Sequence, residues 1–119
     1  MILIIDRELT DLNTYINAER SNRFKASKIK KTETDYVSKL AKEAKLQPTD
    51  RPVYMLYKWY CKNKRKDKSN VAFARKFIED GLIEAGIIKN DGWNDIEGFQ
   101  DKFLIDKDRP RVEVFIVLL

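Results

Sequence analysis

Histidine is absent from this sequence, and cysteine occurs once, as Cys61. Without histidine, Ser-His-Asp and Cys-His catalysis are excluded, and a single cysteine also excludes a Cys/His zinc site. No disulfide can form within the chain, which argues against a secreted disulfide-stabilised protein and favours a reducing cytoplasm. Any catalysis must therefore use carboxylates, lysine, hydroxyl groups or a hard metal ion.

Long apolar runs are also missing. None approaches the roughly 20 residues that a membrane-spanning helix needs, so we expect no membrane partner. The 119 residues suit one domain, residues 1–119, with a modest hydrophobic core. Charged residues make up 36% of the chain, and 24 Lys and Arg against 19 Asp and Glu give a net charge of +5. This excess permits a polyanionic partner without requiring one.

Alternating or short apolar runs predict strands at both ends and in the middle of the chain. The clearest is 53–62, in which Val53, Met55, Tyr57, Trp59 and Cys61 would share a buried face. Further strands are expected at 2–5, 99–106 and 109–119, with a short one at 87–96 that enters a turn. The last five residues, FIVLL, are apolar on both faces and need to be covered.

Helical periodicity separates these strands. We expect a helix capped by Thr10 or Asp11, a second that opens at Thr32, and a third over 71–86 capped by Ser69 or Asn70. In the third, Gly81 indicates close packing and Gly86 marks the end. The pattern predicts an α+β fold, in which a small mixed or antiparallel sheet packs against helices in a single domain.

Two segments are rich in basic residues. Residues 20–31 hold six and no acid, and Lys58–Lys68 hold six in eleven, beside Tyr57, Trp59 and Tyr60. Lysine and arginine neutralise phosphates, and aromatic rings stack on unpaired bases. The plainer interpretation is a solvated turn and a mobile charged loop. The candidate nucleic-acid-binding residues are Arg20, Arg23, Lys25, Lys28, Lys30, Lys31, Lys58, Lys62, Lys64, Arg65, Lys66 and Lys68.

Separated acids supply the other candidate chemistry. If Asp67 and Asp91 lie at neighbouring strand ends, they would form a carboxylate pair suited to Mg²⁺, which could activate a water and neutralise a phosphate. Lys76 and Asp80 are four residues apart on one helix face. They are either an ordinary ion pair, or Lys76 stabilises charge that develops on a phosphate. A surface salt bridge is the commoner role for such acids.

The block DKSNVAFARKFIEDGLIEAGIIKND, residues 67–91, resembles the central block of RusA-type Holliday junction resolvases. In that family a D-x-D-N motif precedes a lysine on the following helix, then D-x-L, A-G and an N-D or D-D pair. The N-terminal LNTYINAERSNRFKASKIKK, the KWYCKNKRKD strand and GWNDIEGFQDKFLIDKDRPRVEV are similar to phage and prophage members from Gram-positive hosts. The matched residues are Asp67, Ser69, Asn70, Lys76, Asp80, Leu82, Ala85, Gly86, Asn90 and Asp91.

The resemblance implies a homodimeric, Mg²⁺-dependent endodeoxyribonuclease, with Mn²⁺ as a possible substitute, that nicks four-way DNA junctions in recombination and repair. It implies a cytoplasmic protein of a bacterial host cell. It points to Asp67, Asp91 and Lys76 as catalytic candidates, and to Asp67 and Asp91 as metal-binding candidates. Ser69 departs from the pattern, because the family has a second aspartate at that position. A neutral hydroxyl removes one charge from the metal shell. Asp80 is a further metal-binding candidate, because Asp80 or Asp95 would supply a missing carboxylate if the fold places either one nearby.

Three hypotheses follow. The first is an active RusA-like endonuclease acting on branched DNA. The second is a branched-DNA-binding protein of the same fold whose metal site is weakened by Ser69. The third is a basic interaction module unrelated to that family. Nicking of a four-way junction separates the first from the second, and preference for the junction over linear duplex separates both from the third.

Overall fold

Four strands form one mixed sheet in the order β1-β4-β2-β3 in the computed structural model, which describes all 119 residues. The strands are β1 (Ile2–Ile5), β2 (Val53–Cys61), β3 (Ile96–Ile105) and β4 (Arg111–Leu118). Four helices complete the fold: α1 (Leu12–Ser21), α2 (Arg23–Glu43), α3 (Lys68–Ala72) and α4 (Arg75–Glu84). The predicted α+β class is confirmed.

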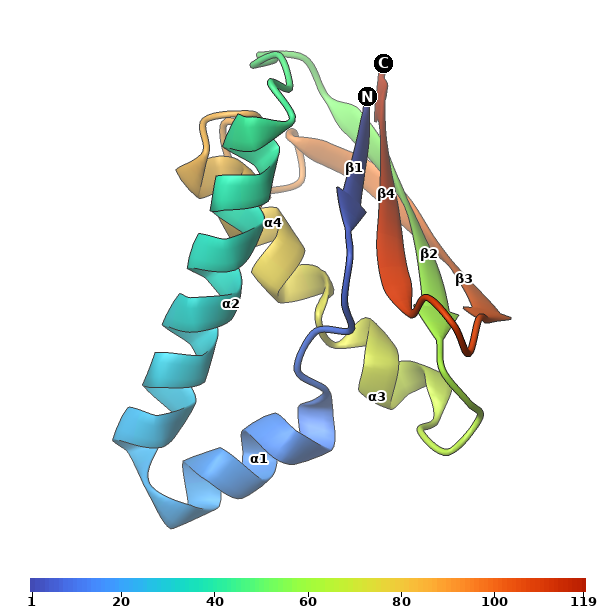
Figure 1. The fold of residues 1–119 in the computed structure, drawn as a ribbon. Coiled ribbons are helices and arrows are strands. Elements are labelled where there is room, and N and C mark those ends of the chain that lie inside the picture. Colours follow the sequence, from blue (N-terminus) through green and yellow to red (C-terminus); the bar gives the residue numbers. More distant parts are fainter.

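The sheet brings the two ends of the chain side by side. β1 and β2 both pair antiparallel with β4, whereas β2 and β3 pair parallel, from Val53 opposite Ile96 to Cys61 opposite Ile105. Parallel neighbours require a crossover connection, and α3 and α4 provide it (Figure 1). The β2–α3 connection and the α4–β3 connection therefore lie at opposite ends of the sheet.

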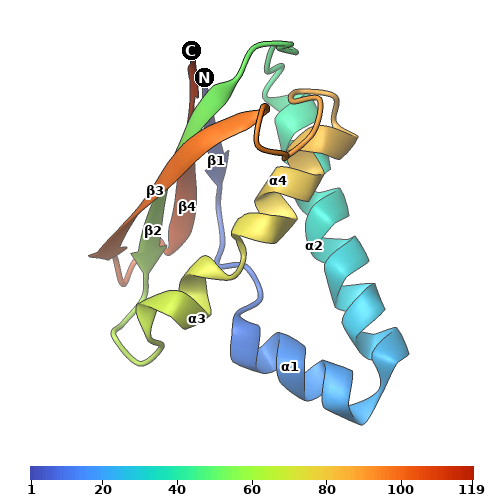
Figure 2. The ribbon, with the colours of Figure 1, turned by 180° about the vertical axis from the view of Figure 1, so that it is seen from behind.

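The hydrophobic core lies between the helices and one face of the sheet. Alternate residues of β2, namely Val53, Met55, Tyr57 and Trp59, are buried as predicted, whereas Cys61, predicted on the same face, is only partly buried. All four helices lie on this side of the sheet, as Figures 1 and 2 show from opposite directions. The other face, which we call the outer sheet face, carries Ile2, Ile4, Tyr54, Leu56, Lys58, Tyr60, Arg111, Glu113, Phe115 and Val117.

The basic segment 20–31 is helical, so the predicted loop or arm was wrong, as was the helix start at Thr32. Asn22 ends α1 and begins α2. Its backbone N–H donates to the Ala18 carbonyl at 2.9 Å, and its side-chain oxygen accepts from the Phe24 N–H at 2.8 Å. A single extended residue therefore turns the chain sharply between two helices.

The helix predicted over 71–86 is two helices, α3 and α4. Its cap is Asp67, whose Oδ1 accepts from the Asn70 N–H at 2.8 Å, and not Ser69 or Asn70. At the junction, the Ala74 N–H donates to the Val71 carbonyl and the Phe77 N–H donates to the Ala74 carbonyl. Each of these bonds spans three residues, as in a 3₁₀ turn, rather than the four of an α-helix. The sequence has no glycine or proline at this break.

Both glycine predictions on this segment hold. A Cβ on Gly81 would lie 2.6 Å from the Val37 side chain, so α4 crosses α2 at close range. Gly86 has a φ of 76°, the left-handed conformation of a helix end. The strand predicted at 87–96 was wrong: Ile87 and Ile88 are buried in the core without pairing in the sheet, and β3 begins at Ile96.

No helix combines the length and the apolar character needed to cross a bilayer.

Candidate functional site

Asp67 and Asp91 do not lie at neighbouring strand ends. Asp67 follows the C-terminal end of β2, and Asp91 precedes the N-terminal end of β3. Because these strands are parallel, the two positions belong to opposite ends of the pair (Figure 1). The predicted carboxylate pair was therefore wrong in its geometry, and Asp67 serves instead as the cap of α3.

Lys76, Asp80 and Asp91 do come together. The Lys76 ammonium lies 3.3 Å from Asp80 Oδ1 and 2.5 Å from Asp91 Oδ2. The hydrogen bond with Asp91, with the charge of Asp80, holds the pKa of Lys76 above its usual range. The two carboxylates are largely shielded from solvent, whereas the lysine is half exposed. We call this group the Lys76 cluster.

Glu79 adjoins this cluster and was not anticipated from the sequence. It is half-buried, its Oε2 accepts a hydrogen bond from the buried Tyr57 hydroxyl at 3.1 Å, and it lines one hollow with Asp91 and Trp93. Burial raises the pKa of its carboxyl, and the charge of Asp91 adds to the effect. A glutamate in a charged helix gives no sequence signal of burial, because that depends on where β2 packs.

The carboxylates present fit a hard divalent ion only in part. No group of three or more acidic or cysteine side chains converges to hold a metal. Asp80 and Asp91 nevertheless face one point, which the Lys76 ammonium occupies. Two carboxylates with waters and phosphate oxygens are a common ligand set for Mg²⁺. The donor set thus fits Mg²⁺ in kind, through Asp80 and Asp91 and without Asp67.

The other residues matched to the D-x-D-N motif lie elsewhere. Asn70 is buried, and its side-chain oxygen accepts from the Asn13 N–H at 2.9 Å, which ties α3 to α1. Asp67 and Ser69 line an open hollow with Lys64, Lys68 and Phe103, where β2 and β3 end. This hollow is cationic and aromatic, which suits a phosphate-bearing ligand better than a metal alone.

The predicted basic residues differ in whether a carboxylate already neutralises them. Lys31 pairs with Asp35 at 3.1 Å, and Lys66 pairs with Asp11. Lys58 lies over the Phe115 ring on the outer sheet face. Nine of the twelve have no carboxylate partner and do not lie on that face: Arg20, Arg23, Lys25, Lys28, Lys30, Lys62, Lys64, Arg65 and Lys68.

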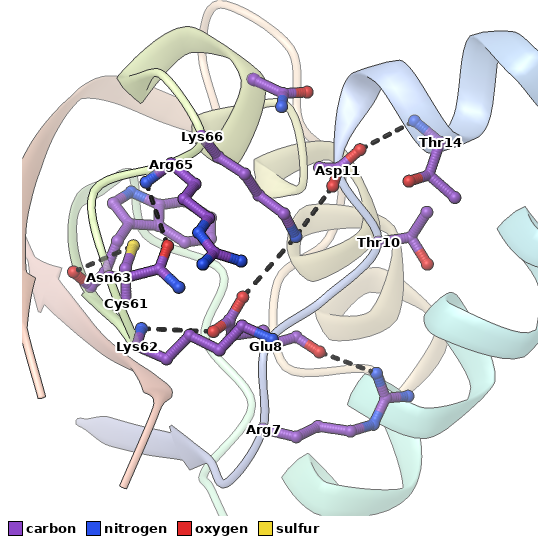
Figure 3. A network of polar contacts seen from close by, with 12 residues as sticks. Arg7, Glu8, Thr10, Asp11, Thr14, Cys61, Lys62, Asn63, Arg65 and Lys66 are labelled. Carbon is purple, nitrogen blue, oxygen red and sulfur yellow. Dashed lines mark hydrogen bonds and ion pairs between the residues drawn. The ribbon is translucent and has the colours of Figure 1, made fainter. Parts of the chain in front are cut away.

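Lys66 anchors the basic turn to the segment before α1 (Figure 3). Its ammonium lies 2.8 Å from Asp11 and 3.7 Å from Glu8, and the Lys62 N–H donates to Glu8 at 3.3 Å. Although burial opposes ionisation, hydrogen bonds from Lys66 and Thr14 hold the pKa of Asp11 below its usual range. Lys66 is thus a structural cation, while its neighbours are free to bind an anion.

The nine free cations lie at one end of the molecule. They belong to the corner between α1 and α2 and to the turn after β2, and α1 runs between these regions (Figures 1 and 2). The chain termini lie at the opposite end. We call residues 20–30 together with residues 62–68 the basic end. An extended polyanion could contact both parts at once.

Comparison with known proteins identifies no family for this chain: no protein-family model matches it, and no curated protein does. The resemblance to RusA-type resolvases therefore rests on the motifs and their order. The basic end and the Lys76 cluster are the two candidate functional regions of the structure.

Proposed function

We propose that this chain acts on branched DNA as a RusA-type Holliday junction resolvase. The observation that carries the proposal is the contact between Lys76 and Asp91 at 2.5 Å, with Asp80 on the same ammonium. All three positions correspond to motifs of that family, yet Asp91 is 15 residues from Lys76 in the chain. The contact between Lys76 and Asp80 follows from helical spacing alone, but a chance resemblance in sequence gives no reason for Asp91 to join them.

DNA binding is assigned to the basic end. Free lysines and arginines neutralise phosphates and release counterions, which supplies most of the sequence-independent affinity for DNA. The Lys66 anchor holds the turn after β2 in place, so its remaining cations are presented without a large loss of entropy on binding. The two parts of the basic end would follow different arms of a branched substrate.

The nicking chemistry is assigned to the Lys76 cluster. Asp80 and Asp91 would hold Mg²⁺, which when bound supplies an activated water and neutralises charge on the scissile phosphate. Without the metal, the Lys76 ammonium occupies the point that both carboxylates face, so Mg²⁺ would displace it. The Lys76 ammonium then offers a hydrogen-bond donor to a phosphate oxygen as charge develops there.

A second candidate is a branched-DNA-binding protein of the same fold with a weakened metal site. Ser69 in place of the second aspartate favours it, as does the use of Asp67 as a helix cap away from the Lys76 cluster. In that case the basic end keeps its role, and cleavage is slow or absent.

Incubation with an end-labelled four-way junction, with and without Mg²⁺ or Mn²⁺, separates the candidates. The resolvase proposal expects paired symmetric nicks that Asp91→Asn abolishes. Asp95→Asn is a matched control, because Asp95 lies in the same connection but binds the Gly92 N–H rather than Lys76. Binding without nicks, with nicking gained in Ser69→Asp, favours the second candidate. Equal affinity for junction and linear duplex contradicts both.

The proposal includes a homodimer, which the resemblance implies. The outer sheet face supports it, because Ile2, Leu56, Tyr54 and Val117 lie around Phe115 on a surface that no helix covers. Contiguous apolar surface of this kind commonly marks an interface.

A further inference from the structure

Phe24 stands at the corner between α1 and α2 with 69% of its surface exposed. Its backbone is held at the start of α2, where the Asn22 side-chain oxygen accepts the Phe24 N–H at 2.8 Å. In both ribbon views this corner is the part of the helical layer farthest from the sheet (Figures 1 and 2).

The exposure of Phe24 follows from helix geometry. The face of α2 that turns inward carries Ala26, Glu33 and Val37, all buried. Phe24 precedes Ala26 by two residues, which is about 200° around a helix with 3.6 residues per turn. The ring therefore points away from the core and gains little of the free energy that burial of a phenylalanine gives.

The charged residues that adjoin Phe24 in the chain are all basic. Arg20, Arg23, Lys25, Lys28 and Lys30 have no carboxylate partner, and no acid occurs between residues 20 and 31. The Arg23 guanidinium lies 5.2 Å from the ring centroid, and Lys28 follows Phe24 by four residues on the same helix face. A ligand for this surface must be anionic and must also offer a flat apolar face.

Nucleic acid has both properties, since phosphates alternate with bases whose faces stack on aromatic rings. An intact duplex hides those faces, whereas bases at a branch point can leave the stack. We propose that Phe24 stacks on a base at the branch point of the DNA, while the surrounding cations hold the flanking phosphates. This inference rests on the proposed binding of branched DNA and extends it to how a branch is distinguished from a duplex.

A junction that carries 2-aminopurine either at the branch point or within an arm tests the inference in the absence of divalent metal. We expect the wild-type protein to change the fluorescence at the branch point only. Phe24→Ala should lose this signal and bind the junction about tenfold more weakly, as for loss of one stacked base, with affinity for linear duplex unchanged. Phe24→Trp should restore both.

Leu119→Ala is the control, because it also removes an exposed apolar side chain but lies away from the basic end. Unchanged junction affinity and an unchanged branch-point signal in Phe24→Ala would overturn the inference while leaving the proposed function standing. Wild-type protein without preference for the junction would remove the proposed function itself. Phe24-dependent binding to anionic phosphatidylserine vesicles, with no effect of Phe24→Ala on junctions, would assign the corner to membranes and overturn the inference.

Discussion

Gly81 lies where α4 crosses α2, and the space beside it is already occupied. A Cβ there would meet Val37 at 2.6 Å and the Thr34 carbonyl oxygen at 3.0 Å, the latter a backbone atom that moves little. We expect Gly81→Ala to lower the free energy of unfolding by about 1–3 kcal/mol, as overpacked cores do. Urea unfolding measures this.

Gly98→Ala is the matched control for that substitution. Its Cβ would meet only the outer ring atoms of Tyr54, at 3.1 Å and 3.5 Å, and this side chain can shift. We expect a change of less than about 0.5 kcal/mol, as for ordinary surface positions. Equal losses in both variants would contradict the close crossing of α2 and α4.

The raised pKa of Glu79 predicts that the stability of the fold changes with pH in a definite direction. Burial raises its pKa in the folded state, whereas the unfolded value is about 4.3. The protonated form therefore favours folding, and this contribution is present below about pH 4.3 and is lost as the pH rises through the higher folded pKa. Glu79→Gln should remove this loss of stability with rising pH and keep the hydrogen bond from the Tyr57 hydroxyl. A stability difference from wild type that stays constant between about pH 4 and pH 7 would contradict this assignment.

At the scale of elements, β2 was predictable and the helix boundaries were not. The alternation Val53, Met55, Tyr57, Trp59 specifies one buried face, and the sheet uses it. The sequence marks the boundary at Asn22 and the break between α3 and α4 less clearly than it marks β2. An asparagine caps helices in many contexts, and the break depends on how Phe73 and Phe77 pack around Tyr15, at centroid distances of 5.3 Å and 6.1 Å. Such tertiary contacts override local propensity.

The turn after β2 yields a contrast between two lysines. Lys66 bridges Asp11 and Glu8, whereas Lys64 has no carboxylate partner. Lys66→Ala leaves the nearly buried Asp11 carboxylate without its cation, so we expect a loss of about 1–3 kcal/mol in unfolding free energy. Lys64→Ala should leave stability unchanged and weaken DNA binding. Thermal unfolding together with junction affinity measures both, and equal stability of the two variants would contradict the anchoring role of Lys66.

At the scale of the whole molecule, the candidate site could be predicted only in part from the sequence. The ion pair between Lys76 and Asp80 followed from helical spacing, and the structure adds Asp91. The partner of Asp91 depends on how the connection after α4 folds back, which periodicity does not encode. Asp67 does not meet Asp91, because β2 and β3 are parallel and the two residues lie at opposite ends of the pair. The pattern of apolar residues does not determine strand direction.

We expect a single added charge on the outer sheet face to disrupt the proposed dimer. Val117 is half exposed on this face and pairs in register with Tyr54, so a glutamate there would be solvated in a monomer but unpaired and buried in a dimer. We expect wild type to sediment as a dimer and Val117→Glu as a folded monomer. Gln47→Glu adds the same charge in an exposed loop away from the sheet and should remain dimeric. A monomeric wild type would contradict this use of the face.

The most direct test of the account is a competition between an immobile four-way junction and a linear duplex of equal length, in metal-free buffer over a range of salt concentrations. We predict that the junction binds at least about tenfold more tightly, and that the slope of log affinity against log salt becomes shallower in Lys28→Ala and in Lys64→Ala. The decrease should be about 0.9 for each phosphate that the variant no longer neutralises. Equal affinity for both DNAs, or slopes that these variants leave unchanged, would contradict branched-DNA recognition by the basic end.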